Sequence, residues 1–287
     1  MKLARFVEGS RQRLGIVNDE ASTIRPLDVE AEDMTELIER YSDARELNSA
    51  ARGELALDRI KLLAPVMPRR NIFCVGKNYR EHAKEFAGSG FEAGAVKGAE
   101  IDEYPAVFSK PPSTVVGNGD VVRLHPQATS SVDYEAELAV VIGRTGSDIS
   151  PARAYEHVFG YTIVNDVTAR DRQRNHKQWF LGKGLDTFCP MGPWLTTADA
   201  VDPANLAVKC WVNGELRQNA NTRDLIFDIP TLIATISAGL TLQPGDVIAT
   251  GTPAGVGIGF NPPRFLKAGD EVSISIDGIG TLSNRFA

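Results

Sequence analysis

The stretch VDYEAELAVVIG, residues 132–143, begins with acidic residues at every second position. In an extended strand successive side chains point to opposite faces, so Asp133, Glu135 and Glu137 share one face. Three neighbouring carboxylates repel one another, and the following AVVIG is typical of a strand that is buried on both faces. A solvated outer face or a strand edge charged against aggregation would explain the acids. A cation bound between them is the third explanation, and it removes the conflict.

A second stretch, GYTIVND at residues 160–166, places Asp166 at the end of a run of apolar residues. Asp is a common turn residue, so this position means little by itself. With Glu135 and Glu137 it makes a set of three hard oxygen ligands, which favours Mg²⁺ or Mn²⁺, with Ca²⁺ as a further option, over Zn²⁺ or copper. Three protein ligands leave open positions on an octahedral ion, which predicts catalysis rather than a structural role.

Short β segments dominate the chain from Asn71 onward: NIFCVG, AVFSK, VVRL, LAVKCWVNG, DVIATG and EVSISIDGIGTLSN accompany the two stretches above. Gly, Pro and Asn turns separate them, which predicts an antiparallel or mixed, β-rich α+β fold and not a doubly wound one. Helices are predicted at residues 78–86, 150–158, 168–176 and 228–239, the second with Ser150 as its N-cap.

Residues 1–69 are predicted to form a small N-terminal α+β domain. KLARFV and RLGIVN flank EGSRQ as a hairpin, and MTELIERY has the pattern of a short amphipathic helix. The segment LLAPVMPRR, with two prolines and two arginines, marks the linker. Residues 70–287 then form the catalytic domain.

Composition limits the classes of partner. A net charge of -6 over 287 residues argues against a broad nucleic-acid surface, although a locally basic pocket for an anionic metabolite remains compatible with it. Arg5 and Glu8 interrupt the position of a signal core, and no apolar stretch approaches a membrane span, so we expect a cytoplasmic protein without membrane contact. Cys74, Cys189 and Cys210 are predicted to be buried, free thiols.

Six blocks in order resemble the fumarylacetoacetate hydrolase family: NIFCVGKNYREHAKE, AVFSKPPSTVVG, DYEAELAVVIG, GYTIVNDVTARD, WFLGKGLDTFCPMGPW and PGDVIATGTPAGVG. They span about three quarters of the chain, and six ordered blocks are far more specific than any one of them. The resemblance implies a catalytic domain folded as a mixed β-roll, a homodimer, and a small-molecule 2-oxo acid substrate that chelates a divalent metal.

The resemblance also assigns roles by motif. It implies metal ligation by Glu135, Glu137 and Asp166, and stabilisation of a developing enolate by Lys183 of FLGKG. It places three residues around the oxo-acid pocket: Arg170, Gln173 and Thr252. In one branch of the family a His/Glu pair on a short helix transfers protons, and the matching residues are His82 and Glu85.

His82 and Glu85 stand three positions apart, so a helix brings them to one face, where the carboxylate orients the imidazole and raises its basicity. Because such a pair can activate water, hydrolytic C–C cleavage of a 2,4-dioxo acid of the acylpyruvate type ranks first. Tautomerisation or decarboxylation of oxaloacetate and isomerisation of an oxo-diacid share the same enolate and follow closely. A metal-stabilised protein that binds a metabolite without turnover is the alternative from another class.

Two further expectations concern the surroundings of the site. Residues 86–104, rich in Gly and Ala, are predicted to form a lid. The basic residues of RDRQRNHKQ, namely Arg172, Arg174, His176 and Lys177, either recognise a distal group of the substrate or form a solvated helix face. The run GTPAGVG matches neither of the glycine-rich nucleotide motifs, so nucleotide binding is not expected.

Overall fold

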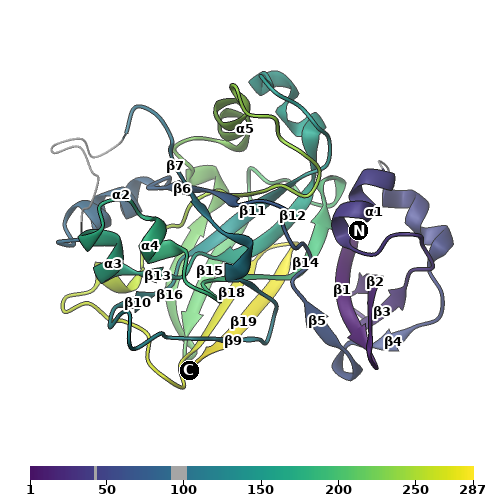
Figure 1. Ribbon diagram of the computed structural model, residues 1–287, viewed down its shortest axis with the longest axis horizontal. Coiled ribbons are helices and arrows are strands. Elements are labelled where there is room, and N and C mark those ends of the chain that lie inside the picture. The colour runs from purple at the N-terminus through teal and green to yellow at the C-terminus, as the bar shows by residue number, and fades with distance from the viewer. Residues whose placement is uncertain (42–43, 92–101) are drawn as a thin grey trace.

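A computed structural model describes residues 1–41, 44–91 and 102–287 (Figure 1). Most of the predicted lid therefore lies outside the described residues. The described helices are few and short, as predicted: α1 (Met34–Arg40), α2 (Arg80–Ala87), α3 (Arg170–Asn175), α4 (Phe180–Lys183) and α5 (Ile229–Ser237). Short 3₁₀ helices cover Ala44–Ala50, Leu57–Arg59, Pro112–Thr114, Pro151–His157, Ala198–Ala200, Thr222–Asp224 and Gly257–Gly259.

A large mixed sheet runs through the molecule. Its order is β4 (Leu55–Ala56), β3 (Thr23–Pro26), β2 (Arg11–Asn18), β1 (Lys2–Glu8), β14 (Cys189–Thr197), β12 (Val158–Asn165), β11 (Ala136–Ile142), β17 (Val247–Ala249), β6 (Ile72–Gly76) and β7 (Ala106–Lys110). Two further strands join it, β5 (Lys61–Leu63) beside β1 and β8 (Val115–Val116) beside β14. The predicted mixed, β-rich α+β fold is confirmed.

A second sheet packs on the first. It contains β16 (Glu215–Asn221), β15 (Ala207–Val212), β18 (Glu271–Ile276), β19 (Gly280–Phe286) and β9 (Val121–Val122). Leu138 and Val140 of β11 share an apolar cluster with Ile274 of β18, whereas Ala139 and Val141 share another with Leu37 of α1. Successive residues of β11 therefore face two different cores, which explains the continuous apolar run.

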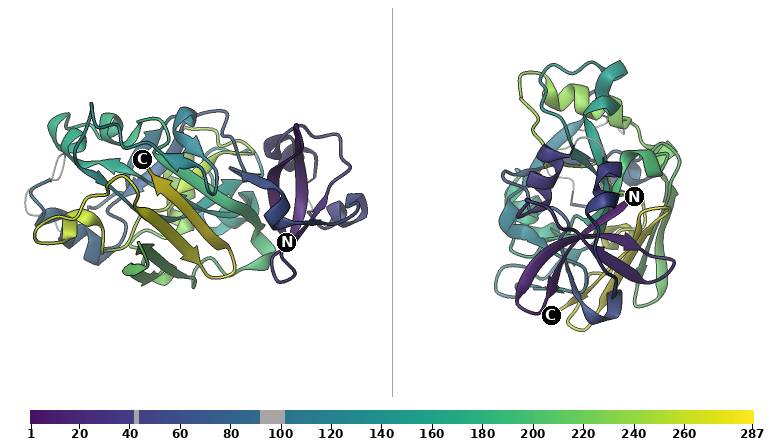
Figure 2. Two further views of the ribbon diagram at one scale, coloured as in Figure 1. Left: turned by 90° about the horizontal axis from the view of Figure 1, so that it is seen from below. Right: turned by 90° about the vertical axis from the view of Figure 1, so that its right-hand side faces the viewer.

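The N-terminal hairpin of β1 and β2 forms as predicted and extends the large sheet. Leu3 of β1 pairs with Leu195 of β14, so hydrogen bonds run from residues 1–69 into the rest of the chain. Asp33 caps α1, because its side chain accepts the backbone N–H of Glu36. Figure 2 shows this unit standing at one end of the molecule. The division at residue 69 and the homodimer stay predictions.

Two predicted elements differ from the structure. Residues 151–157 form a 3₁₀ helix, and Ser150 makes no side-chain capping bond to it. The stretch DYEAELAVVIG is split into β10 (Val132–Asp133), which pairs with β13 (Thr168–Ala169), and β11. Between them the N–H of Glu135 donates to the side-chain oxygen of Asn165 at 3.0 Å instead of to a backbone carbonyl of β12. This side-chain bond interrupts the ladder beside the acidic residues.

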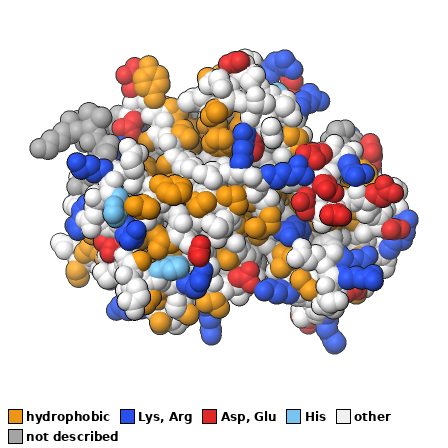
Figure 3. All heavy atoms as spheres, in the orientation of Figure 1, with side chains coloured by type: hydrophobic (Ala, Val, Ile, Leu, Met, Phe, Trp, Pro, Cys, Tyr) orange, Lys and Arg blue, Asp and Glu red, His pale blue; other side chains and the backbone are white. Residues whose placement is uncertain are grey.

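The surface and the cysteines complete the description. Figure 3 shows basic and acidic side chains interspersed on one face, with acidic ones gathered over the N-terminal unit. Cys74, Cys189 and Cys210 are buried and free, as predicted. Among the described residues, no helix has the length and apolar character that crossing a membrane requires.

Candidate active site

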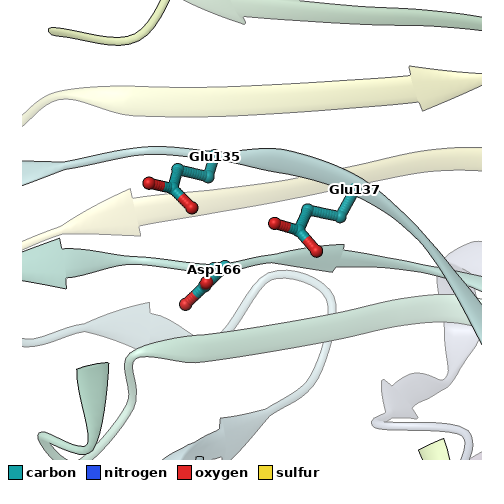
Figure 4. Close-up of side chains that lie close together, drawn as sticks. All are labelled: Glu135, Glu137 and Asp166. Carbon is teal, nitrogen blue, oxygen red and sulfur yellow. The ribbon is translucent and has the colours of Figure 1, made fainter. Parts of the chain in front are cut away.

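Three acidic side chains converge where β11 begins and β12 ends. The two strands are antiparallel, with Glu137 opposite Val164, so Glu135 and Glu137 come to lie beside Asp166. One carboxylate oxygen from each lies within 4.8 Å of the others, and all three residues are buried (Figure 4). A charged strand edge and a solvated face, the two alternative explanations of the sequence, are both wrong, because buried carboxylates need partners.

Two lysines neutralise part of this cluster. The Lys183 ammonium, at the last residue of α4, donates to Glu135 Oε2 at 2.8 Å and to Asp166 Oδ2 at 2.6 Å. The Lys110 ammonium, at the last residue of β7, donates to the other oxygen of Asp166 at 2.6 Å. Glu137 accepts a backbone N–H from Gly251 at 2.9 Å. Within the described residues it has no lysine or arginine partner.

The electrostatics of the cluster point to a missing positive charge. Burial, with Asp166 and Glu135 close by, raises the pKa of Glu137 well above its usual range. Burial also acts to raise the pKa of Glu135, but Lys183 and Arg170 outweigh it and lower that pKa. Asp166 and Glu135 overcome the effect of burial on Lys183 and raise its pKa, so the ammonium stays charged. An all-oxygen donor set with one unpaired carboxylate fits a hard divalent cation.

Asp133 does not join Glu135 and Glu137, although strand alternation predicts that it shares their face. Because the ladder is interrupted after β10, its carboxylate turns to Arg170, whose Nε donates to Asp133 Oδ2 at 2.9 Å. Arg170 opens α3, and its Nη2 lies 2.7 Å from Glu135 Oε1, while Nη1 donates to Gln173 at 3.2 Å. Asp133 therefore fixes the guanidinium between the acidic cluster and the cleft.

The His82/Glu85 pair is present on α2. His82 Nδ1 lies 3.2 Å from Glu85 Oε2, and the imidazole is buried. The backbone N–H of Gly255 donates to Glu85 Oε1 at 3.0 Å, which fixes the position of the carboxylate. With Nδ1 directed at Glu85, the second ring nitrogen is left for proton exchange.

The glycine-rich run at residues 251–259 supplies backbone amides to the site's carboxylates. Gly251 donates to Glu137, Gly255 to Glu85, and Gly257 to Asp133 at 2.6 Å. The sequence predicted a role only for Thr252 of this run, because a sequence pattern does not show where a backbone N–H points. In the fold it ties the metal cluster, the arginine and the histidine pair together.

One cleft collects the predicted residues. Of the nine predicted site residues, all but Glu85 and Asp166 line it. Phe86, Phe108 and Trp179 add aromatic side chains to its wall. Figure 1 shows α2, α3 and α4 together at the end of the molecule away from the N-terminal unit. The basic residues predicted as a distal recognition set do not line the cleft: Arg172 donates to the Leu181 carbonyl, and Arg174 lies over a phenylalanine ring.

Sequence reasoning missed Lys110 and Lys77. Lys110 lies within the block AVFSKPPSTVVG, where only its apolar neighbours suggested burial. Lys77 precedes α2 and lines the cleft. A lysine at the end of a strand is ordinarily solvated, so neither position carried a signal.

Comparisons with known proteins show the family of the chain. The family model described as fumarylacetoacetate (FAA) hydrolase C-terminal matches residues 71–287. The oxaloacetate tautomerase YisK of Bacillus subtilis is 56% identical over 233 residues, 80% of this chain and 74% of the relative.

Two solved structures align with 100% of this chain, and each alignment covers 99% of the solved chain. Fumarylacetoacetate hydrolase from Exiguobacterium antarcticum is 45% identical with a TM-score of 0.87. Maleylpyruvate hydrolase from Sphingobium sp. SYK-6, in complex with manganese(II) ion and pyruvate, is 36% identical with a TM-score of 0.79. With the family model matching from residue 71 to the C-terminus, the chain belongs to the fumarylacetoacetate hydrolase family.

Proposed function

We propose that this chain is a divalent-metal-dependent tautomerase of oxaloacetate, which moves a proton between C3 and the C2 oxygen. The observation that carries the proposal is the Lys183 ammonium, held by Glu135 and Asp166 in the lining of a cleft that also contains a buried imidazole. The similarity to an oxaloacetate tautomerase supports it and favours tautomerisation over hydrolysis. Decarboxylation of oxaloacetate passes through the same enolate and is separated from tautomerisation by product analysis.

Glu135, Glu137 and Asp166 are the residues that would hold Mg²⁺ or Mn²⁺, as their oxygens are close enough to share one ion. Such a cation would act as a Lewis acid toward a 2-oxo acid and favour its enolate form. The structure neighbour that was solved with manganese and pyruvate supports both the class of ion and the class of ligand. Ca²⁺ is compatible with the same oxygen set.

Lys183 would stabilise the negative charge that develops on the C2 oxygen. Its raised pKa keeps it cationic, and it is fixed by two carboxylates, so little reorganisation is needed as the charge forms. Arg170, with Gln173 beside it, would bind and orient the carboxylate next to the oxo group. Both line the cleft on the Lys183 side of the cluster.

His82 would remove the proton from C3 and deliver one to the C2 oxygen. The contact of Nδ1 with the Glu85 carboxylate orients the ring, so that its other nitrogen is directed away from Glu85. The tautomerisation needs no other reactant, because the proton that leaves C3 is balanced by the one that reaches the C2 oxygen. His82 therefore serves as base and then as acid.

Hydrolytic cleavage of a 2,4-dioxo acid is the second candidate. The same pair, with His82 Nδ1 3.2 Å from Glu85, could activate a water molecule, and one structure neighbour is a maleylpyruvate hydrolase. For the base, the two reactions differ in whether it takes a proton from carbon or from water; hydrolysis in addition adds that water to the distal carbonyl and breaks the C–C bond, which releases a carboxylic acid and the pyruvate enolate. Incubation with acylpyruvates separates them, since hydrolysis releases pyruvate and tautomerisation does not.

Metal removal is the direct test of the proposed function. We expect the Mn²⁺-loaded protein to convert enol-oxaloacetate to the keto form, seen as loss of the enol's ultraviolet absorbance. Thorough chelation should lower the rate about 100-fold or more, because the enolate loses its main stabilising charge. An unchanged rate after chelation contradicts the proposal. If chelation lowers the melting temperature but the metal-loaded protein turns over no 2-oxo acid, the result supports the alternative of a metal-stabilised protein that binds a metabolite without catalysis.

Gly259→Ala tests the His82/Glu85 pair without substituting either residue. The backbone at Gly259 is ordinary, and an added methyl group would overlap the Glu85 carboxylate, the flexible end of a side chain. The fold should survive while Glu85 is displaced from His82, so we expect kcat to fall about 10- to 100-fold with unchanged Mn²⁺ affinity. The matched control is Gly88→Ala on α2, where the new methyl group meets only the Lys84 carbonyl at 3.8 Å. Equal activity of the two variants would show that Glu85 is not needed.

A further inference from the structure

Lys77 is a cation of the cleft that the proposed chemistry does not use. It follows β6 and precedes α2, and it lines the same cleft as His82 and Lys183. Its side chain is only 12% exposed, although a lysine in this position between two elements would ordinarily reach solvent. A buried ammonium beside an active site requires a negative partner.

The backbone at Lys77 is held in an uncommon conformation. Its φ is 55°, in the left-handed region that non-glycine residues rarely adopt. The next residue, Asn78, fixes the turn, because its side-chain amide donates to the Phe227 and Thr250 carbonyls and its oxygen accepts the Phe227 N–H. Strained residues that the surroundings hold this firmly cluster at functional sites. The direction of the Lys77 side chain is therefore set by a rigid turn.

The other two lysine and arginine residues among the described lining residues are already engaged. Lys183 is bonded to Glu135 and Asp166, and Arg170 is paired with Asp133 and Glu135. These contacts direct both cations to the metal cluster and hence to the oxo-acid end of a substrate.

The carboxylate partner of Lys77 is of a different kind. Its ammonium lies 2.5 Å from Asp102 Oδ2, a carboxylate outside the metal cluster that is 21% exposed. Arg170 also pairs with a carboxylate outside the metal cluster, Asp133, but that one is fully buried. Among the described lining residues, Lys77 is the cation that faces a partly exposed carboxylate, and Phe86, Phe108 and Trp179 supply apolar walls. Its position is already one in which a carboxylate binds.

We propose that Lys77 binds the distal carboxylate of a 2-oxo-dicarboxylate, and that Asp102 occupies this place when the substrate is absent. The proposal rests on the proposed function and adds its specificity: four-carbon oxo-diacids are preferred over oxo-monoacids. Exchange of one carboxylate for another keeps the Lys77 charge compensated, so binding does not leave a buried cation unpaired. A charge-assisted bond to the distal carboxylate then discriminates against substrates that lack it.

A matched pair of substrates tests this role. 2-Oxobutanoate differs from oxaloacetate in having a methyl group where the distal carboxylate stands, and deuterium exchange at C3, followed by NMR, reports enolisation of both. Lys77→Met should lower kcat/KM for oxaloacetate about 30-fold and change the value for 2-oxobutanoate by less than about twofold. Lys77→Arg should retain the preference for the diacid. Lys84→Met, an exposed lysine of α2 paired with Glu81, should leave both substrates unaffected.

Asp102→Asn should act in the opposite direction. Removing the competing carboxylate should lower KM for oxaloacetate about threefold and leave 2-oxobutanoate unchanged, with kcat preserved for both. A structural role for the Lys77–Asp102 pair would instead lower the melting temperature in both variants and affect both substrates equally. Equal losses for the two substrates, or a Lys77→Met variant that keeps its diacid preference, overturn the proposal.

Binding separates this proposal from the proposed function. Calorimetry with the Mn²⁺-loaded protein measures the affinities for oxaloacetate and 2-oxobutanoate whether or not either is turned over. If the wild type binds the diacid more tightly and Lys77→Met loses this preference, the role of Lys77 is supported. That holds even if the wild type exchanges no deuterium, a result that would contradict only the proposed tautomerase activity. The absence of any diacid preference in wild-type binding overturns the role of Lys77.

Discussion

Lys183→Met should lower kcat for oxaloacetate tautomerisation about 10²- to 10³-fold, with a much smaller change in KM. The ammonium stabilises a charge that exists only after C3 has lost its proton, so its removal raises the barrier more than it weakens substrate binding. The measurement is the steady-state rate at saturating Mn²⁺, which excludes loss of the ion as the cause. A variant whose KM rises while kcat is kept would assign Lys183 to substrate binding.

Lys110→Met is the matched control for that result. Lys110 contacts the opposite oxygen of Asp166, is fully buried and does not line the cleft, so we expect it to act on the cluster and not on the substrate. Lys110→Met removes a buried partner from one carboxylate of the cluster and Lys183→Met from two, so both should melt at lower temperature than the wild type. At saturating Mn²⁺, however, Lys110→Met should keep kcat within about tenfold of the wild-type value, whereas Lys183→Met should not. Similar kcat losses in the two would indicate that general disturbance of Asp166 explains both.

Glu137→Gln should abolish activity and yet stabilise the metal-free protein. Gln retains an oxygen for the Gly251 N–H but removes the carboxylate that has no described cationic partner beside Glu135 and Asp166. We expect the metal-free melting temperature at pH 8 to rise by roughly 2–4 °C, which corresponds to about 1 kcal/mol. The increase in melting temperature on adding Mn²⁺ should disappear, and kcat should fall about 100-fold or more, because one anionic ligand is lost.

Asp133→Asn provides the contrasting variant. Asp133 has a cationic partner, Arg170, and accepts the N–H groups of Gly257 and Ile258. Neutralising Asp133 leaves Glu135 as the one described anionic partner of a buried guanidinium. We expect this variant to melt at lower temperature than the wild type, with a loss of about 3 kcal/mol. If Glu137→Gln destabilised the metal-free protein as strongly, the view of Glu137 as the unpaired ligand would be wrong.

Local sequence patterns account for much of the fold. Alternation and apolar runs predicted β11 and β12, and the three-residue spacing of His82 and Glu85 placed them on one face of α2. Both patterns depend on neighbours along one element, whose geometry the backbone fixes. The sequence did not predict the interruption at Glu135, because the amide that leaves the ladder bonds to Asn165, thirty residues away.

The acidic residues of one strand face, together with Asp166 at the end of the next strand, predicted a shared cation as one of three explanations, since like charges beside buried strand residues must be neutralised. Tertiary contacts alone show how the positive charge around these carboxylates is distributed. Lys110 reaches Asp166 across 56 positions, and the Gly257 amide reaches Asp133 across 124. Such contacts have no period and no local motif. They exist because the packed sheets bring the ends of distant strands to one place, where burial makes every charge depend on its neighbours.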